Sequence, residues 1–192
     1  AGINAALKVR EEDIFCLRRD ESYIGVMIDD LVTRGVDEPY RMFTSRAEHR
    51  LFLREDNADL RLTEKGYNIG VVGRERYEIV VSKKKMIDDT HEMLRSVRLM
   101  PTKETKHMLS SLGFGTIKNP VTLEELLQKP AVTMKEIQQI NPGLAAVTED
   151  IAYQVELNVK YRGYIERQHD MVRRTKNLEN AKIPQDIAYG EV

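Results

Sequence analysis

The chain has 192 residues, of which 41% are hydrophobic and 32% charged, a composition typical of a globular protein large enough to bury a core. Its 30 Lys and Arg residues against 31 Asp and Glu residues give a net charge of -1, which excludes polyanion binding by overall charge and leaves only local basic clusters to argue for it. No apolar run approaches the ~20 residues that a membrane span needs, and the single cysteine, Cys16, excludes an internal disulfide and favours a cytoplasmic location.

The first forty residues carry few secondary-structure signals. The stretch Tyr23 to Val32 fits either a short strand or the start of a buried helix, because Gly25 and the adjacent Asp29 and Asp30 limit its length. The opening residues lack the basic start and long apolar core of a signal peptide and contain no initiator Met. We therefore expect the chain to be an internal portion of a longer protein.

From Thr44 onward the periodicity predicts helices. Arg46, Arg50 and Arg54 are spaced i, i+4, i+8, which would stack them on one helix face. A second helix is expected after an N-cap at Asp56 or Asn57, with Gly70 as its C-terminal cap.

A longer helix is predicted over residues 73–99 from its apolar stripe, and Pro101 ends it. The sequence predicts small helices joined by loops over residues 101–147. Two of these helices begin with capping boxes, Thr122 with Glu125 and Thr133 with Glu136. Thr148 is the expected N-cap of one long final helix, a rod of about 45 Å.

The stretch from Tyr40 to Leu62 concentrates guanidinium groups among apolar side chains. Its arginines are Arg41, Arg46, Arg50, Arg54 and Arg61. They could clamp a polyanion, because arginine suits bidentate phosphate contacts, or they could form ion pairs with carboxylates such as Glu48 and Asp59. Spacing alone does not decide between these interpretations.

A second basic cluster lies on the expected final helix between residues 158 and 182. Its seven cations are Lys160, Arg162, Arg167, Arg173, Arg174, Lys176 and Lys182. Three carboxylates oppose them, so the cluster fits either a solvated helix face or a phosphate-binding surface. Tyr161 and Tyr164 fall on the apolar stripe, which favours core packing over base stacking.

Catalytic signatures are nearly absent. Cys16 stands near Arg18 and Arg19 but has no other sign of a reactive thiol, and the four histidines are too scattered for a metal set. The sequence contains no HExxH, GxSxG, GxGxxG or Walker A motif. The chain does not read as a complete enzyme, and no catalytic or metal-binding residue is assigned within it.

Four stretches resemble the GidA/MnmG family. They are AGINAA (1–6), SYIGVMIDDLVTRGVDEPYRMFTSRAEHRLFLREDNADLRLTEKG (22–66), QVELNVKYRGYIERQ (154–168) and IPQDIAY (183–189). The likeness runs along the whole chain and is weakest over residues 96–130. Members of this family are FAD-dependent enzymes that, with a GTPase partner, install carboxymethylaminomethyl or aminomethyl groups at carbon 5 of the tRNA wobble uridine.

The resemblance implies a mainly α fold, an irregular helical domain with one long C-terminal helix, preceded by a remnant of an α/β flavin-binding domain. Residues 1–39 would be the tail of the flavin domain, and residues 40–192 an incomplete helical C-terminal domain.

The resemblance also implies ligands and partners. Ile3 and Asn4 would approach FAD, with NADH as the reductant, while the rest of the flavin site and the catalytic cysteines would lie upstream. tRNA contacts would come from Arg41, Arg46, Arg50, Arg54, Arg61, Lys160, Arg162, Arg173 and Arg174. The expected partners are tRNA, the GTPase and a second copy in a homodimer; a protein-interaction scaffold is the alternative function.

Overall fold

The computed structural model describes residues 1–179, whereas residues 180–192, which include Lys182 and the stretch IPQDIAY, lie outside the described residues. The elements in chain order are α1 (Gly2–Val9), α2 (Tyr23–Thr33), the 3-10 helix η1 (Thr44–Arg46), α3 (Ala58–Asn68), α4 (Arg74–Ser96), β1 (Arg98–Leu99), α5 (Lys103–Ser111), β2 (Val121–Thr122), α6 (Leu123–Leu127), α7 (Met134–Ile140), the 3-10 helix η2 (Pro142–Leu144), α8 (Glu149–Lys160) and α9 (Arg162–Glu179). Within this range the strands are two residues long each, so the expectation of a mainly α fold is confirmed.

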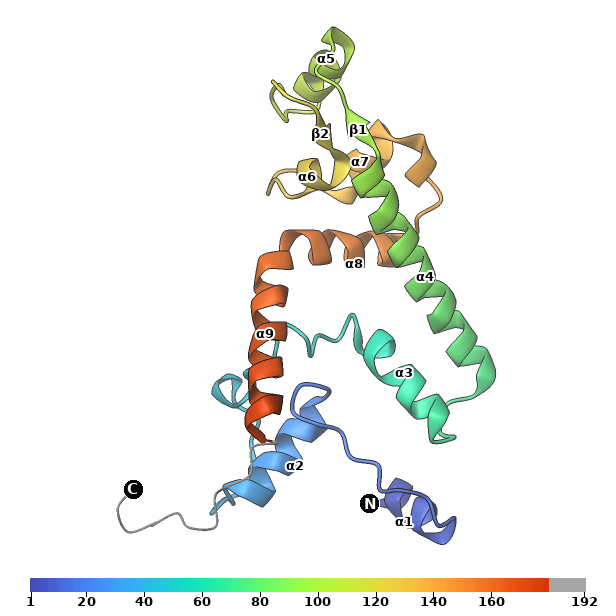
Figure 1. Cartoon of the computed structure of the whole chain (residues 1–192), viewed down its shortest axis with the longest axis vertical. Helices are drawn as coiled ribbons and strands as arrows, with labels where there is room; N and C mark the ends of the chain where they lie inside the picture. The colour runs from blue at the N-terminus through green and yellow to red at the C-terminus, as the bar shows by residue number, and fades with distance from the viewer. Residues whose placement is uncertain (180–192) are drawn as a thin grey trace, which may run out of the picture.

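The molecule is elongated, with α4 running along one side (Figure 1). The small elements α5 to α7 and the β1–β2 pair gather around the C-terminal end of α4, and α8 crosses below them. α9 then runs down from α8 toward α2, while α1 lies apart at the opposite end from α5 (Figure 1).

The main core lies between α4, α6, α7 and α8. Fifteen buried residues from Ile87 to Val159 form it, including Leu94 and Leu123, both of which are fully buried. The apolar positions of α4 that face this side follow the helical repeat predicted from the sequence. An antiparallel pairing of Leu99 with Val121 brings the start of α6 back against the end of α4.

Both predicted capping boxes are confirmed. The backbone N–H of Thr122 donates to Glu125 over 2.7 Å and the N–H of Glu125 donates to the Thr122 hydroxyl over 3.1 Å at the start of α6. Thr133 and Glu136 make the same arrangement at the start of α7. The short helices of this region therefore begin where their local sequence satisfies the free N–H groups.

The helix predicted from Thr44 through Arg54 is wrong. Helical backbone there is confined to η1, and residues 47–57 form turns and bends. Ala47 and Leu53 are buried, and Gln154 of α8 donates to the Asp56 carbonyl over 2.8 Å, so tertiary packing overrides the local i, i+4 pattern. Arg46, Arg50 and Arg54 consequently do not share one helix face.

The prediction of one long final helix is also wrong, because this part of the chain forms two helices. α8 ends at Lys160, Tyr161 has non-helical dihedral angles, and α9 leaves in a different direction (Figure 1). The bend divides the apolar stripe, so Tyr161 and Tyr164 are 44% and 57% exposed and the prediction that they pack in the core is wrong as well.

α2 resolves the choice between strand and helix for residues 23–32. The hydroxyl of Ser22 caps it by accepting from the Gly25 N–H over 3.0 Å. A Cβ on Gly25 would lie only 2.2 Å from the carbonyl oxygen of Arg18, so glycine is needed for the close approach of α2 to the preceding loop.

The boundary expected between residues 39 and 40 is crossed by side-chain contacts. The Tyr40 hydroxyl donates to Asp30 over 2.8 Å, and Arg19 pairs with Glu48 over 2.7 Å. Whether residues 1–39 belong to a flavin-binding domain stays a prediction.

Gly25→Ala is expected to destabilise the protein by about 2 kcal/mol or more, because the new methyl group meets backbone that cannot rotate away. Gly163→Ala is the matched control, since a Cβ there meets nothing within 4 Å and alanine is the better helix former. Thermal unfolding followed by circular dichroism measures both; equal Tm values for Gly25→Ala and wild type would contradict the close approach.

Candidate nucleic-acid interface

Arg19 is the centre of an ion-pair network that joins the loop before α2 to α2 itself and to the turn after η1. Its Nη1 lies 2.7 Å from Asp30 Oδ1 and 2.9 Å from Asp29 Oδ2, and its Nε and Nη2 make a bidentate pair with Glu48 at 2.7 and 2.9 Å. Nη2 also donates to the carbonyl oxygen of Arg46 over 3.0 Å. One guanidinium thus fixes three chain segments.

Asp30 is fully buried and depends on this network for its charge. It accepts hydrogen bonds from Arg19, from the Tyr40 hydroxyl and, at 3.4 Å, from Arg46. Burial raises the pKa of the Asp30 carboxyl, but the bonds from Arg19 and Tyr40 outweigh it and the pKa is lowered overall. The Arg19 bond likewise lowers the pKa of Glu48, and Glu48 in return raises the pKa of Arg19.

Arg54 and Arg61 hold the chain between η1 and α3 in place. Arg54 pairs with Asp56 at 3.1 Å and donates to the Leu51 carbonyl, while buried Gln154 of α8 donates to Asp56 Oδ2 over 2.6 Å. Arg61 donates to the carbonyl oxygens of Glu21 and Arg54 and to the Asn57 side chain. Burial lowers the pKa of Arg61, and its donors are directed at protein oxygens.

Three of the four cations of α8 and α9 that were expected to contact tRNA are also paired, and Arg174 is the exception. Lys160 lies 2.8 Å from Glu156, Arg173 pairs with Asp170, and Arg162 pairs with the buried Glu124 of α6. Glu124 accepts in addition from Arg95 of α4 over 2.9 Å. The Arg173 pair is exposed and contributes little, whereas Glu124 joins α4, α6 and α9.

Three of the nine expected tRNA contacts are exposed and have no carboxylate partner among the side chains of residues 1–175: Arg41, Arg50 and Arg174. The guanidinium of Arg41 stacks 5.3 Å from the ring centre of Phe43. Arg46 is intermediate, because it lies over the Tyr40 ring as well as near Asp30 and keeps 30% of its side chain exposed. The expected arginine cluster is therefore largely an internal network, with Arg41 and Arg50 directed outward.

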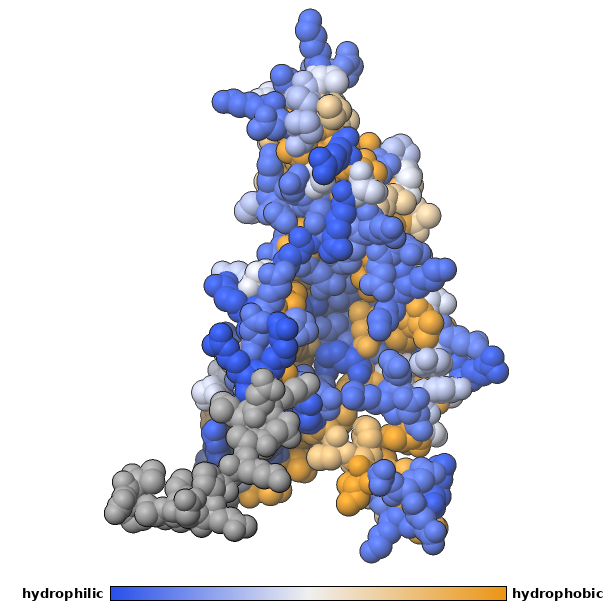
Figure 2. Space-filling view, viewed as in Figure 1, coloured by the Kyte–Doolittle hydropathy of each residue, from blue (hydrophilic) through white to orange (hydrophobic). Residues whose placement is uncertain are grey.

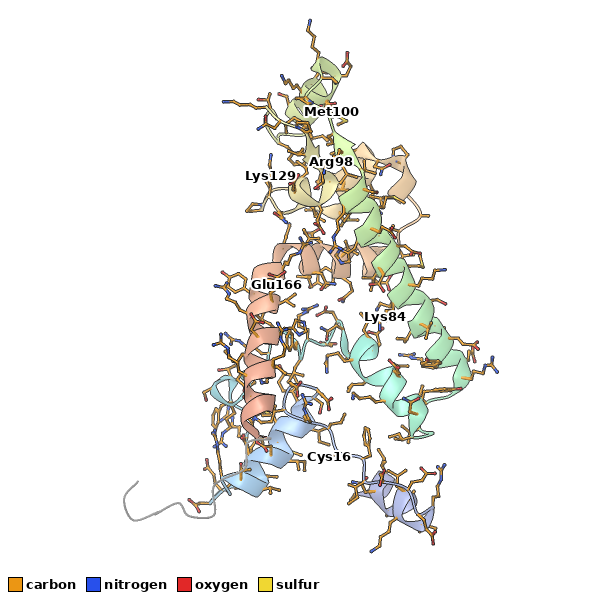
Figure 3. The ribbon with its side chains drawn as sticks, in the orientation of Figure 1. Cys16, Lys84, Arg98, Met100, Lys129 and Glu166 are labelled. Atoms are coloured by element: carbon orange, nitrogen blue, oxygen red, sulfur yellow. The ribbon has the colours of Figure 1, made fainter. Side chains whose placement is uncertain are left out.

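Two cavities flank α9. One of about 500 Å³ lies between α2 and α9 and is lined by Cys16, which Figure 3 labels beside α2, and by Arg19, Val32 and Met171. The other, of about 990 Å³, lies between α9 and residues 51–61. Its arginines, Arg54, Arg61 and Arg173, are opposed by Asp20, Glu166 and Asp170, so neither sign of charge dominates.

Of the two residues expected to approach a flavin, Ile3 is exposed, whereas the side-chain amide of Asn4 is bonded within the chain. The Asn4 side chain accepts from the Phe15 N–H and donates to the Phe15 carbonyl, both over 2.9 Å, so both ends of its amide hold the loop after α1. Ile3 is 40% exposed. Ile3 and the start of α1 could contact one edge of a flavin, but Asn4 does not fit a role in binding it through its amide.

Among the side chains that the structure describes, those of residues 1–175, no group of three His, Cys, Asp or Glu is placed to hold a metal ion. Over the same range no helix is both long and apolar enough to cross a membrane.

Sequence reasoning missed Arg19, Gln154 and Glu124 as organising residues. The partners of Arg19 in α2 and after η1 are 10 to 29 residues away, and those of Gln154 nearly 100. The one local signal is the Asp29–Asp30 pair inside an apolar helix, since a buried carboxylate requires a cation.

Comparison with known proteins defines the class. Residues 74–169 match a family model described as tRNA modifying enzyme MnmG/GidA C-terminal helical domain. The chain is similar over its full length to a solved structure of Aquifex aeolicus GidA, with a TM-score of 0.77 and 38% identity, covering 100% of this chain and 30% of that one. The fold is therefore that of a helical region from a tRNA-modifying enzyme class.

Sequence relatives agree. A Geobacter sulfurreducens protein named tRNA uridine 5-carboxymethylaminomethyl modification enzyme MnmG is 50% identical over 189 residues, 98% of this chain and 30% of that protein. A Listeria innocua protein of the same name is 48% identical over the whole chain, again 30% of its length. The chain belongs to the MnmG/GidA family and spans 30% of the length of these relatives.

Asp30→Asn is expected to lower Tm by about 5 °C or more at neutral pH, because Arg19 and Arg46 lose the charge of a buried partner. The pKa of Asp30 is lowered on folding, so its charge stabilises the fold above the ordinary value of 3.8 and this stabilisation is lost as the pH falls through the lower folded value. The variant should therefore lose less stability than wild type between pH 5 and 2, measured by urea unfolding at several pH values.

The neighbouring carboxylate provides the control. Asp29 is 44% exposed and contacts the same guanidinium, so Asp29→Asn should cost much less at neutral pH. Equal losses of stability in Asp30→Asn and Asp29→Asn would show that the burial of Asp30 does not determine how much its charge stabilises the fold.

Proposed function

We propose that the chain is part of a FAD-dependent enzyme that adds carboxymethylaminomethyl or aminomethyl groups at carbon 5 of the wobble uridine of tRNA. Family membership along the whole chain supports this substrate and reaction. The described residues supply no catalytic set, so the chemistry, FAD and the reductant NADH are assigned to parts of the protein outside this chain. FAD would supply the redox chemistry when bound, and Ile3 would contact it at most from one edge.

The role of this portion is to dock the tRNA backbone. The observation that carries this proposal is that Arg41 and Arg50 are exposed and unpaired by carboxylates among the described residues, while the Arg19 network holds the segment that carries them. Guanidinium groups on a fixed loop can contact phosphates without first losing an internal ion pair. Arg46 and Arg174 lie within the same proposal as secondary contacts. The paired Arg54, Arg61, Lys160 and Arg162 act first as structural cations, whereas Arg173 forms an exposed pair that contributes little.

A second candidate function, docking of protein, is favoured by the surface of α2. Its exposed apolar residues are Tyr23, Ile24, Ile28, Leu31 and Val32, and Val32 is 78% exposed. Figure 2 shows hydrophobic side chains reaching the surface in the lower half of the view, where Figure 1 places α2. An exposed apolar helix face normally has a partner, which would be another part of the longer protein, a second copy in a homodimer, or the GTPase.

Arg50→Glu and Arg41→Glu are each expected to weaken binding of unmodified tRNA about tenfold and to lower the slope of log K against log salt by nearly one per lost phosphate contact. Filter binding across a KCl series measures both quantities. Arg76→Glu is the matched control, since Arg76 is an exposed arginine of α4 outside the docking segment.

A structural cation should differ from Arg50 when thermal unfolding is measured. Arg61→Leu is expected to lower Tm, because three protein oxygens lose their donor, whereas Arg50→Leu should leave Tm unchanged. If Arg50→Glu and Arg41→Glu bind tRNA like wild type, the docking proposal is wrong.

Ile24→Glu combined with Ile28→Glu is expected to reduce self-association measured by sedimentation velocity, because it places charge on the apolar face of α2. Ile79→Glu, at a 58% exposed position of α4, is the control for added charge alone. A sedimentation coefficient that does not change with protein concentration in wild type would argue against a second copy as the occupant of this face.

A further inference from the structure

A shallow pocket of about 260 Å³ opens beside the start of α2. It is lined by Tyr23, Met42, Phe43, Thr44, Ala47 and Arg50. Its volume falls below the usual range for drug-sized ligands, so it suits one planar ring rather than a dinucleotide. Tyr23 comes from the start of α2, and the other lining residues come from the continuous stretch 42–50 that runs through η1.

The floor of the pocket is fixed and its rim is open. Ala47 is 6% exposed, and its N–H donates to the Thr44 carbonyl over 3.2 Å. The adjacent carbonyl of Arg46 accepts from Arg19 over 3.0 Å, which ties the floor to the buried network. The site therefore needs little reordering before a ligand enters.

The rim presents aromatic surface next to positive charge. Phe43 is 43% exposed and Tyr23 42%. Arg41 stacks over the Phe43 ring at 5.3 Å, and Arg50, which lines the pocket, is exposed with no carboxylate partner among the side chains of residues 1–175. An aromatic face with unpaired guanidinium groups beside it matches a ligand that is both planar and flanked by anionic groups.

Unpaired RNA has this chemistry. Its bases stack on aromatic rings and on guanidinium planes, and each base is joined to phosphates on both sides. A purely apolar ligand would leave the adjacent arginines without a role, and duplex RNA keeps its bases stacked inside the helix.

We propose that this pocket, named here the Phe43 pocket, binds one unpaired base of a tRNA loop, with Phe43 and Tyr23 as the stacking surface and Arg50 on an adjacent phosphate. This inference rests on the proposed tRNA-docking function and adds to it a preference for loops over stems.

The test measures fluorescence anisotropy of two RNA probes with the 192-residue chain: a hairpin with an unpaired loop, and the same stem closed as a blunt duplex. Phe43→Leu is expected to weaken hairpin binding about tenfold and to leave duplex binding unchanged, because leucine fills the space without a π-face. Phe43→Tyr should bind the hairpin like wild type. Tyr153→Leu, at a 54% exposed aromatic of α8, is the control and should change neither affinity.

The outcomes separate the two proposals. If wild type binds neither RNA, the docking function fails and the Phe43 pocket fails with it. If wild type binds the RNAs but Phe43→Leu binds the hairpin as well as wild type does, or loses both probes equally, only the Phe43 pocket is overturned. A Tm equal to that of wild type confirms that Phe43→Leu is folded in this comparison.

Discussion

The contact between Arg19 and Asp30 is the constraint on which the arginine-rich part of the molecule depends. A carboxylate with no exposure to water requires cationic and hydrogen-bonding partners, and Arg19, Tyr40 and Arg46 converge on it from three segments. The same Arg19 reaches Glu48 and the carbonyl of Arg46, so the path of residues 40–48 follows from the need to neutralise one buried charge. This is why Arg41 and Arg50 can be exposed on a defined loop although no helix carries them.

The arginines fall into two groups, those that bond to protein oxygens and those whose guanidinium groups are exposed. Arg54 and Arg61 stabilise the irregular chain before α3 by donating to protein oxygens, and Arg162 joins α9 to α6 through Glu124. Binding phosphates with these side chains would first require breaking bonds that the fold uses. The count of basic residues in the sequence therefore overstates the surface that is available to a polyanion.

Sequence reasoning succeeded where the determinants are local. The capping boxes at Thr122 and Thr133 mark the starts of α6 and α7, and Gly70, with a φ of 77°, ends the α3 region as predicted. It failed for residues 47–57, where a helical spacing of arginines is overridden by contacts with α8 that are about 100 residues distant. No periodicity within a segment can reveal partners that far along the chain.

The break between α8 and α9 gives the molecule a corner where a straight rod would have had none. Arg162, the first residue of α9, is clamped to Glu124, which is also held by Arg95, so three helices meet at that corner. α9 extends from this corner toward α2 (Figure 1). Its residue Val172 is buried and lines the same cavity as Arg19. Glu124 therefore helps to set the direction in which α9 leaves α8, and a second anchor further along α9, where Gln168 donates to the Glu48 carbonyl over 2.8 Å, holds that direction against the arginine-rich loop.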